Sequence, residues 1–151
     1  MNTAMNVVEI AQRIATEAHA DQKDKTGHPY IGHPTRVAER TRTPGGADDA
    51  VATAWLHDVI EDTDITGDDL IAQGIPAHVV AAVEALSKRS GEAPEDYFSR
   101  VNAEPLAIRV KHADLDDNTD PERVARLDDA LRERLAAKYL RARQLLSPIQ
   151  D

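Results

Sequence analysis

A histidine and three carboxylates stand close together near the middle of the chain. His57 and Asp58 are adjacent, and Glu61 and Asp62 follow within four residues. Imidazole and carboxylate together suit first-row divalent metals such as Mn²⁺, Fe²⁺, Co²⁺ or Zn²⁺. Because residues three and four apart share one face of a helix, a helix through this segment would place Glu61 and Asp62 beside the histidine–aspartate pair.

Apolar residues surround this acidic cluster on both sides. Ala52, Ala54, Trp55 and Leu56 precede it, and Val59–Ile60 lies within it. Many acidic clusters are only solvated faces of helices. In a segment as apolar as this one, however, the carboxylates would repel one another unless a cation or water relieved them. The pattern therefore favours a cation site.

Composition limits the class of protein. With 151 residues, the chain is long enough for one domain with a real core. It contains no cysteine, which excludes disulfides, thiolate zinc sites and cysteine nucleophiles. It has no apolar run of about 18 residues and no basic-then-apolar leader, so we expect a cytoplasmic protein without a membrane span. The net charge of -9 argues against nucleic acid or an anionic membrane as a partner.

The pattern of apolar residues predicts helices throughout. Only 3% of residues are aromatic and alanine is abundant, which favours closely packed helices over sheets. We predict one all-α domain of about eight helices over residues 1–151. The main predicted segments are residues 3–21, a helix opened by His33-Pro34, residues 47–60, a short helix from Thr66, residues 77–86, a short helix at Tyr97, a helix from Pro105, and residues 128–146. Residues 21–32, Pro44-Gly45-Gly46 and residues 90–94 are predicted breaks.

Two further residues could join the central pair. His33 stands at the start of a predicted helix, and Asp114 stands near the end of another apolar helix. With His57 and Asp58 they would offer two imidazoles and two carboxylates, a set that favours a first-row divalent metal over Ca²⁺ or Mg²⁺. Spacing alone leaves open whether the four side chains meet.

Four segments, in this order along the chain, resemble motifs of the HD-domain phosphohydrolases. The likeness is closest to the hydrolase domain of the RelA/SpoT group and its small stand-alone members. The segments are residues 27–34 (GHPYIGHP), 54–63 (AWLHDVIEDT), 85–88 (ALSK) and 110–118 (VKHADLDDN). A histidine–aspartate pair alone would be a weak signal, whereas four ordered segments are specific.

The resemblance implies an activity and a set of residues for it. The family removes pyrophosphate from the 3′ position of guanosine tetra- or pentaphosphate, (p)ppGpp. The synthetase and regulatory domains of its long members have no counterpart here, so only hydrolysis is expected. The implied Mn²⁺ ligands are His33, His57, Asp58 and Asp114. Glu61 and Asp62 would position and deprotonate the attacking water, and Asn118 would face the nucleotide. Phosphoryl transfer also requires positive charge, which Lys23, Lys25 and Lys111 would add.

Three departures from the family pattern concern the substrate. Asp24 stands where the group commonly has an arginine, and Leu115 and Asp117 stand where it often has arginine and histidine. Two alternatives to a (p)ppGpp hydrolase therefore stay open. One is an HD phosphatase for another nucleotide, such as a nucleoside monophosphate or NADPH. The other is a non-catalytic protein that binds a nucleotide, against which the intact Glu61-Asp62 pair argues. The identity of the metal and the oligomeric state are also open.

Overall fold

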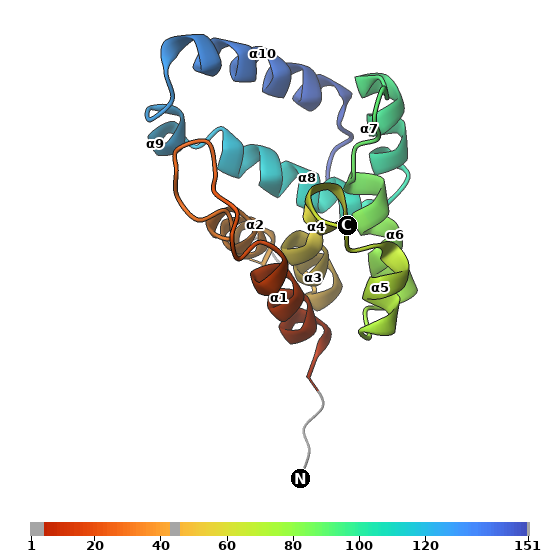
Figure 1. Cartoon of the computed structure of the whole chain (residues 1–151). Helices are drawn as coiled ribbons and strands as arrows, with labels where there is room; N and C mark the ends of the chain where they lie inside the picture. Colours follow the sequence, from red (N-terminus) through yellow and green to blue (C-terminus); the bar gives the residue numbers. More distant parts are fainter. Residues whose placement is uncertain (1–4, 43–45, 151) are drawn as a thin grey trace.

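The fold is built from helices packed around one central helix. The computed structural model describes residues 5–42 and 46–150. Within these residues it contains no strand, only a single antiparallel bridge between Lys23 and Pro29. The helices are α1 (Val7–Ala18), α2 (Gly32–Arg42), α3 (Asp48–Leu56), α4 (Val59–Asp62), α5 (Gly67–Ala72), α6 (Ala77–Leu86), α7 (Pro94–Asn102), α8 (Pro105–Asn118), α9 (Pro121–Val124) and α10 (Asp129–Leu145) (Figure 1).

The predicted all-α class is confirmed. The helices in the described residues number ten rather than about eight, and two of them, α4 and α9, are single turns of four residues. Local signals set most boundaries. Asn6, Thr66, Asp120 and Asp128 accept hydrogen bonds from backbone N–H groups at the starts of α1, α5, α9 and α10. Proline stands in the first turn of α7, α8 and α9, where its missing N–H costs nothing.

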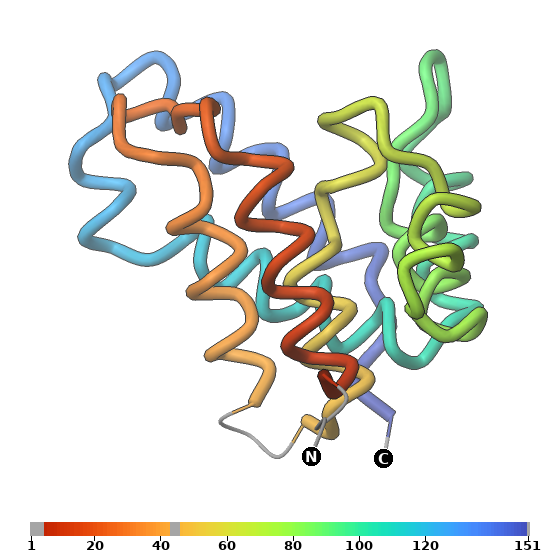
Figure 2. The backbone as a smooth tube through the Cα atoms, turned by 60° about the horizontal axis from the view of Figure 1, so that its bottom comes forward, coloured from red at the N-terminus to blue at the C-terminus, as the bar shows by residue number. Residues whose placement is uncertain are grey.

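Helix α3 is the centre of the core. All seven residues from Ala50 to Leu56 are buried, so every face of this part of the helix meets another element. It packs against α1, α2, α6 and α8. Figure 2 shows α1 and α2, in red and orange, running next to it. Ala50, Ala52 and Ala54 let these helices approach closely. The chain therefore leaves the most buried helix directly into the His57-Asp58 pair.

The predicted continuous helix over residues 47–60 is wrong, because α3 ends at Leu56 and α4 begins at Val59. The His57 ring explains the break. Its Nδ1 lies 2.7 Å from the Ala54 carbonyl oxygen, which the His57 backbone N–H also contacts. A side chain that binds a helix carbonyl competes with the next helical hydrogen bond. His57 and Asp58 therefore occupy a turn, and one α-helical bond, from the Asp62 N–H to the Asp58 carbonyl, still holds Asp62 beside Asp58.

Other predicted boundaries differ by a few residues. The first helix spans Val7–Ala18 instead of residues 3–21. Residues 3 and 4, and Pro44 and Gly45 of the predicted break, lie outside the described residues. No helix of the described chain is both long enough and apolar enough to cross a bilayer.

Helix α10 lies at the edge of the molecule and runs alongside α8 (Figure 1). Ala142 is its one buried residue, and Leu140 is 61% exposed. The end of α10 is fastened through Asn102, which donates to the Leu145 carbonyl and accepts from the Ser147 N–H. These two hydrogen bonds hold the C-terminal end of α10 against α7.

Candidate metal and active site

Four side chains from three parts of the chain converge at one point. His33 comes from the first turn of α2, His57 and Asp58 from the turn after α3, and Asp114 from α8. The Nε2 atoms of His33 and His57 are 3.3 Å apart. Asp58 Oδ2 lies 3.0 Å from His57 Nε2, and Asp114 Oδ1 lies 2.9 Å from His33 Nε2. The spacing in the sequence left open whether these four side chains meet, and in the fold they are neighbours.

The donor atoms of this cluster fit a metal ion. Ligand atoms of His33, His57 and Asp58 all lie within 4.8 Å of one another, and Asp114 Oδ1 is also 3.5 Å from His57 Nε2. The bond from His57 Nδ1 to the Ala54 carbonyl leaves Nε2 to face the cluster. Metal-binding histidines are usually oriented by such a bond on the other ring nitrogen. Two imidazoles and two carboxylates form a set for a first-row divalent metal.

Electrostatic interactions hold the carboxylates of the cluster in their anionic form. Burial alone would raise the pKa of Asp114, but the Lys111 charge and the histidine hydrogen bonds outweigh it and hold this pKa well below its usual value. Lys111 Nζ donates to Asp114 Oδ2 at 3.0 Å. Burial would likewise lower the pKa of His57, yet the adjacent Asp58 raises it well above its usual value.

Tyr30 is a residue of the site that the sequence did not single out as functional. Its hydroxyl donates a hydrogen bond to Asp58 Oδ2. Its ring packs against His19 and His33, with centroids 5.0 and 5.9 Å away. The quoted segment 27–34 contains this tyrosine, but only the fold shows that it contacts Asp58.

The predicted catalytic carboxylates Glu61 and Asp62 lie on α4 and have different surroundings. Glu61 Oε1 accepts the backbone N–H of Lys88 at 2.6 Å, which ties α4 to the segment after α6. Asp62 instead lies near the Tyr30 hydroxyl and the carboxylates of Asp58 and Glu61. Partial removal from water and the charges of Asp58 and Glu61 raise the pKa of Asp62 to about 6. A carboxylate with such a pKa is suited to accepting a proton near neutral pH.

A cavity of about 670 Å³ opens beside the cluster. Its walls come from the loop before α2, from α4, from the α6–α7 connection, and from α8 and α10. This volume is in the range of small-molecule sites. Four of the chain's five aromatic residues line it, namely Tyr30, Tyr97, Phe98 and Tyr139. Aromatic faces of this kind can stack on a base.

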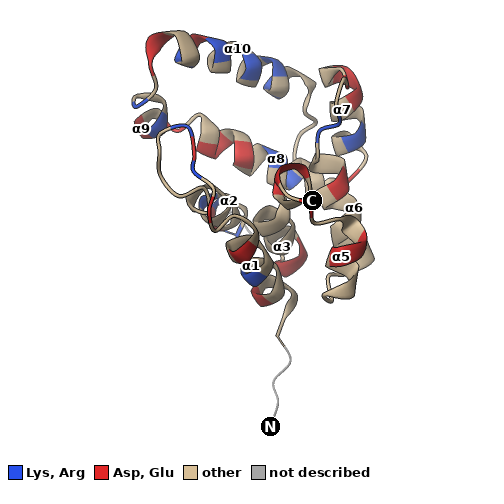
Figure 3. Ribbon diagram, viewed as in Figure 1, with Lys and Arg blue, Asp and Glu red and all other residues tan. Residues whose placement is uncertain are grey.

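The cavity reverses the charge balance of the chain. Among the described residues, eight lysines and arginines and six acidic residues line it, whereas the whole chain has 18 basic and 27 acidic residues. Figure 3 shows the basic positions of α10 alongside acidic positions of α8. The basic residues are Lys23, Lys25, Lys88, Arg89, Lys111, Arg123, Lys138 and Arg141. Such a lining favours an anionic ligand.

Lys88 belongs to a group of mutually repelling cations in this cavity. Burial, and then the charges of Lys111 and Lys138, lower the pKa of Lys88 to about 8. The Nζ atoms of Lys88 and Lys111 lie 5.8 and 5.4 Å from the centre of the Tyr97 ring. Lys88 stands in segment 85–88, which resembles a family motif, but no sequence pattern links it to Lys138 of α10.

The predicted substrate residues all line the cavity, in two different settings. Lys23 and Lys25 are exposed on the loop before α2. Lys111 and Asn118 instead donate hydrogen bonds to Asp114. Lys111 Nζ donates to Oδ2 at 3.0 Å, and Asn118 Nδ2 donates to Oδ1 at 3.1 Å. Asp24, between the two exposed lysines, shapes the loop. Its Oδ1 accepts the backbone N–H groups of Thr26 and His28 at 2.8 and 3.0 Å.

The sequence pattern of one known family, described as the HD domain, matches residues 11–146. The match includes every residue of the four-residue cluster, and the chain belongs to the HD domain family. The fold agrees. A solved structure described as "A metazoan ortholog of SpoT hydrolyzes ppGpp and plays a role in starvation responses" superposes with a TM-score of 0.79. It shares 19% identity and covers 99% of this chain and 90% of its own.

Curated relatives carry names from guanosine tetraphosphate metabolism. A guanosine-3′,5′-bis(diphosphate) 3′-pyrophosphohydrolase of Aquifex aeolicus is 34% identical over 74% of this chain. The protein of that name from Vibrio cholerae is 35% identical over 70%. A probable GTP pyrophosphokinase of Mycobacterium leprae is 30% identical over 73%. The chain spans only 17%, 16% and 15% of their respective lengths. The resemblance found in the sequence motifs is confirmed.

Proposed function

We propose that the protein is a metal-dependent phosphohydrolase that removes pyrophosphate from the 3′ position of (p)ppGpp, giving GDP or GTP. The observation that carries this proposal is the converging cluster of His33, His57, Asp58 and Asp114 beside a cavity rich in cationic and aromatic side chains. The names of the relatives point to the same substrate.

We assign the cofactor as Mn²⁺, held by His33, His57, Asp58 and Asp114. The donor set, of which His33, His57 and Asp114 are buried, and the orientation of His57 support a first-row divalent ion at this point. When bound, such an ion supplies positive charge that acidifies water and neutralises developing charge on a phosphoryl oxygen.

Side chains of this protein would accept the proton, position α4 and bind the substrate. Asp62, with a pKa of about 6, would accept the proton from the attacking water at its carboxylate. Glu61 would fix the position of α4 through its bond to the Lys88 N–H. Lys23, Lys25, Lys88 and Lys138 would bind phosphate groups, and the aromatic residues would pack on the base.

An HD phosphatase for another nucleotide is the second candidate, and the lining of the cavity favours it in one respect. Leu115 is 1% exposed and lines the cavity where the family often has an arginine. Asp24, where the family commonly has an arginine, accepts hydrogen bonds from backbone N–H groups of its own loop. Two cationic groups common in the family are therefore missing near the ligand, and a less highly charged nucleotide would need them less.

We propose that residues 1–151 form one HD domain that acts on a small-molecule nucleotide in the cytoplasm, where nucleotides are made and consumed.

The first experiment follows pyrophosphate release. Protein purified without added metal is supplied with Mn²⁺ and ppGpp, and release should require Mn²⁺, stop with chelator and be lost in Asp58→Ala. If ppGpp gives no pyrophosphate but a nucleotide panel gives phosphate, the second candidate is correct. If nucleotides bind saturably and none is hydrolysed, both enzyme assignments are wrong.

A further inference from the structure

We propose that Asp117 is a positioning residue that fixes the ring of His33 so that its Nε2 faces the metal site. This inference rests on the proposed metal site, and it assigns a role to one of the positions where the chain departs from the family pattern. The sequence alone marked Asp117 only as the loss of a cationic or donor group near the substrate.

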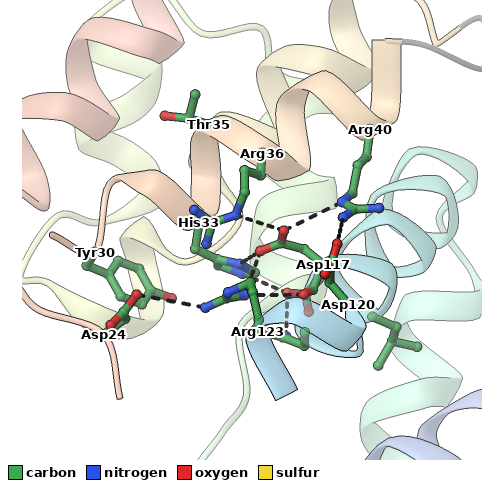
Figure 4. Close-up of polar contacts among 12 residues, drawn as sticks. Asp24, Tyr30, His33, Thr35, Arg36, Arg40, Asp117, Asp120 and Arg123 are labelled. Carbon is green, nitrogen blue, oxygen red and sulfur yellow. Dashed lines mark hydrogen bonds and ion pairs between the residues drawn. The ribbon is translucent and has the colours of Figure 1, made fainter. Parts of the chain in front are cut away.

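Asp117 contacts the ring nitrogen of His33 that faces away from the cluster. His33 Nδ1 lies 2.7 Å from Asp117 Oδ2 (Figure 4). His33 Nε2 lies 2.9 Å from Asp114 Oδ1. Asp114 and Asp117 are three residues apart, and α8 presents both on one face. One helix therefore contacts both nitrogens of the imidazole.

The carboxylate of Asp117 is fully buried, at 0% exposure, and it is surrounded by guanidinium groups. Arg36 Nε donates to Oδ1 at 2.8 Å, and Arg123 Nη1 donates to Oδ2 at 2.8 Å. Arg40 Nε lies 3.5 Å from Oδ1. A buried carboxylate without such partners would be strongly disfavoured. Because arginines of α2 and α9 neutralise it, the Asp117 carboxylate can stay ionised next to Nδ1 of His33.

The chemistry of the pair determines the tautomer of His33. An ionised carboxylate can only accept hydrogen bonds, so His33 Nδ1 must carry the proton. Nδ1 therefore stays protonated, and Nε2, which lies 2.9 Å from Asp114 Oδ1, is the nitrogen that would give up its proton when an ion binds. His57 reaches the same state through the backbone carbonyl of Ala54, which no substitution removes. Of the two histidines, His33 is thus the one whose orientation depends on a side chain.

Asp120 offers a matched control within the same arginine cluster. Its Oδ2 accepts from Arg40 Nη2 at 2.9 Å, and its Oδ1 caps α9 through the Glu122 N–H. In the described part of the chain, Asp120 makes no hydrogen bond or ion pair with His33. Asn caps helices as well as Asp does, so Asp120→Asn removes one negative charge from the cluster while keeping the cap.

The experiment compares Mn²⁺ affinity by calorimetry in wild type, Asp117→Asn and Asp120→Asn. Loss of a residue that orients a metal ligand typically weakens metal binding 10–100-fold, and we expect this for Asp117→Asn, with Asp120→Asn unchanged. Equal affinity in wild type and Asp117→Asn overturns the role of Asp117 alone. If Asp120→Asn weakens binding as much as Asp117→Asn, the effect is one of general charge and the proposal is also overturned. Wild type that binds no Mn²⁺ overturns the metal site itself.

A second measurement needs no variant and no metal. Nitrogen NMR of the imidazoles of wild-type protein reports whether Nδ1 of His33 carries a proton. We expect a protonated Nδ1 that donates to Asp117. An unprotonated Nδ1 contradicts the proposal even if Asp117→Asn fails to fold.

Discussion

At the scale of single residues, the site separates two neighbouring carboxylates by their surroundings. Burial would raise the pKa of Asp58, but the adjacent His57 outweighs it and holds this pKa below its usual value. Asp62, one helical turn further on, has its pKa raised to about 6 by partial burial and by the charges of Asp58 and Glu61. Two carboxylates with pKa values moved apart are typical of a site that divides roles. Here Asp58 suits a permanent anion and Asp62 a proton acceptor.

Asp62→Asn tests this division. The amide keeps the shape of the carboxylate but cannot accept a proton, so kcat for pyrophosphate release should fall by about 10²–10⁴-fold. Mn²⁺ affinity should stay unchanged, because Asp62 is outside the predicted ligand set. Asp58→Asn should instead weaken Mn²⁺ binding. Steady-state kinetics with calorimetry on both variants separates the two effects, and an Asp62→Asn enzyme with wild-type kcat would refute the assignment of the base.

Lys88 predicts a pH dependence of substrate binding. Because its pKa is lowered to about 8, the side chain is charged below that pH and neutral above it. Binding of an anionic substrate should therefore weaken as the pH rises through 8. We expect KM to increase by roughly tenfold between pH 7 and 9, which corresponds to a loss of about 1.4 kcal/mol.

The matched variant for this prediction is Lys88→Arg. Arginine keeps its charge over the whole range, so KM should vary little with pH in the variant. The same rise in KM with pH in both proteins would show that another group titrates.

At the scale of elements, the cavity joins a rigid floor to a more exposed wall. The floor comes from α8 and the turn after α3, which are buried in the core. The wall includes α10, which supplies Lys138, Tyr139 and Ala142 to the cavity and is fastened near its end by Asn102. An element with few buried residues opens more easily than the core. Substrate binding should therefore order α10 more than any core helix.

Hydrogen exchange can measure this difference. In free protein we expect the amides of α10 to exchange faster than those of α3. Adding ppGpp and Mn²⁺ to Asp62→Asn, which retains substrate, should slow exchange in α10. Helix α5 provides the control, because it lines no part of the cavity among the described residues and should not respond. Exchange in α10 as slow as in α3 before ligand is added would contradict the prediction.

At the scale of the whole molecule, the sequence predicted helices and motifs better than the contacts between residues far apart along the chain. Proline, capping residues and apolar spacing act over a few residues, so helices such as α6 and α8 could be placed from them. The break after Leu56 was missed, because periodicity does not register the competition of the His57 ring for a helix carbonyl. His33 and Asp114 are 81 residues apart, and only the resemblance to a family suggested that they meet.

The rest of the site depends on tertiary packing. Lys138 and Tyr139 lie within the helix predicted over residues 128–146, and only the placement of α10 makes them part of the cavity. Asp117 looked like a lost donor, yet the arginines of α2 and α9 make it a partner of His33. These contacts depend on how helices cross, which no local pattern encodes.

Because α2, the turn after α3 and α8 each supply donors to one point, metal binding should stabilise the whole fold. A ligand that binds only the native state at 100 times its dissociation constant adds about 2.7 kcal/mol, or roughly 5–10 °C in Tm for a domain of this size. Thermal unfolding with Mn²⁺ and with chelator should show this difference in wild type. His57→Gln should abolish it. His78→Gln should keep it, because His78 lies outside the cluster, 60% exposed and paired with Asp49. An equal Mn²⁺ shift in His57→Gln would place the ion elsewhere in the molecule.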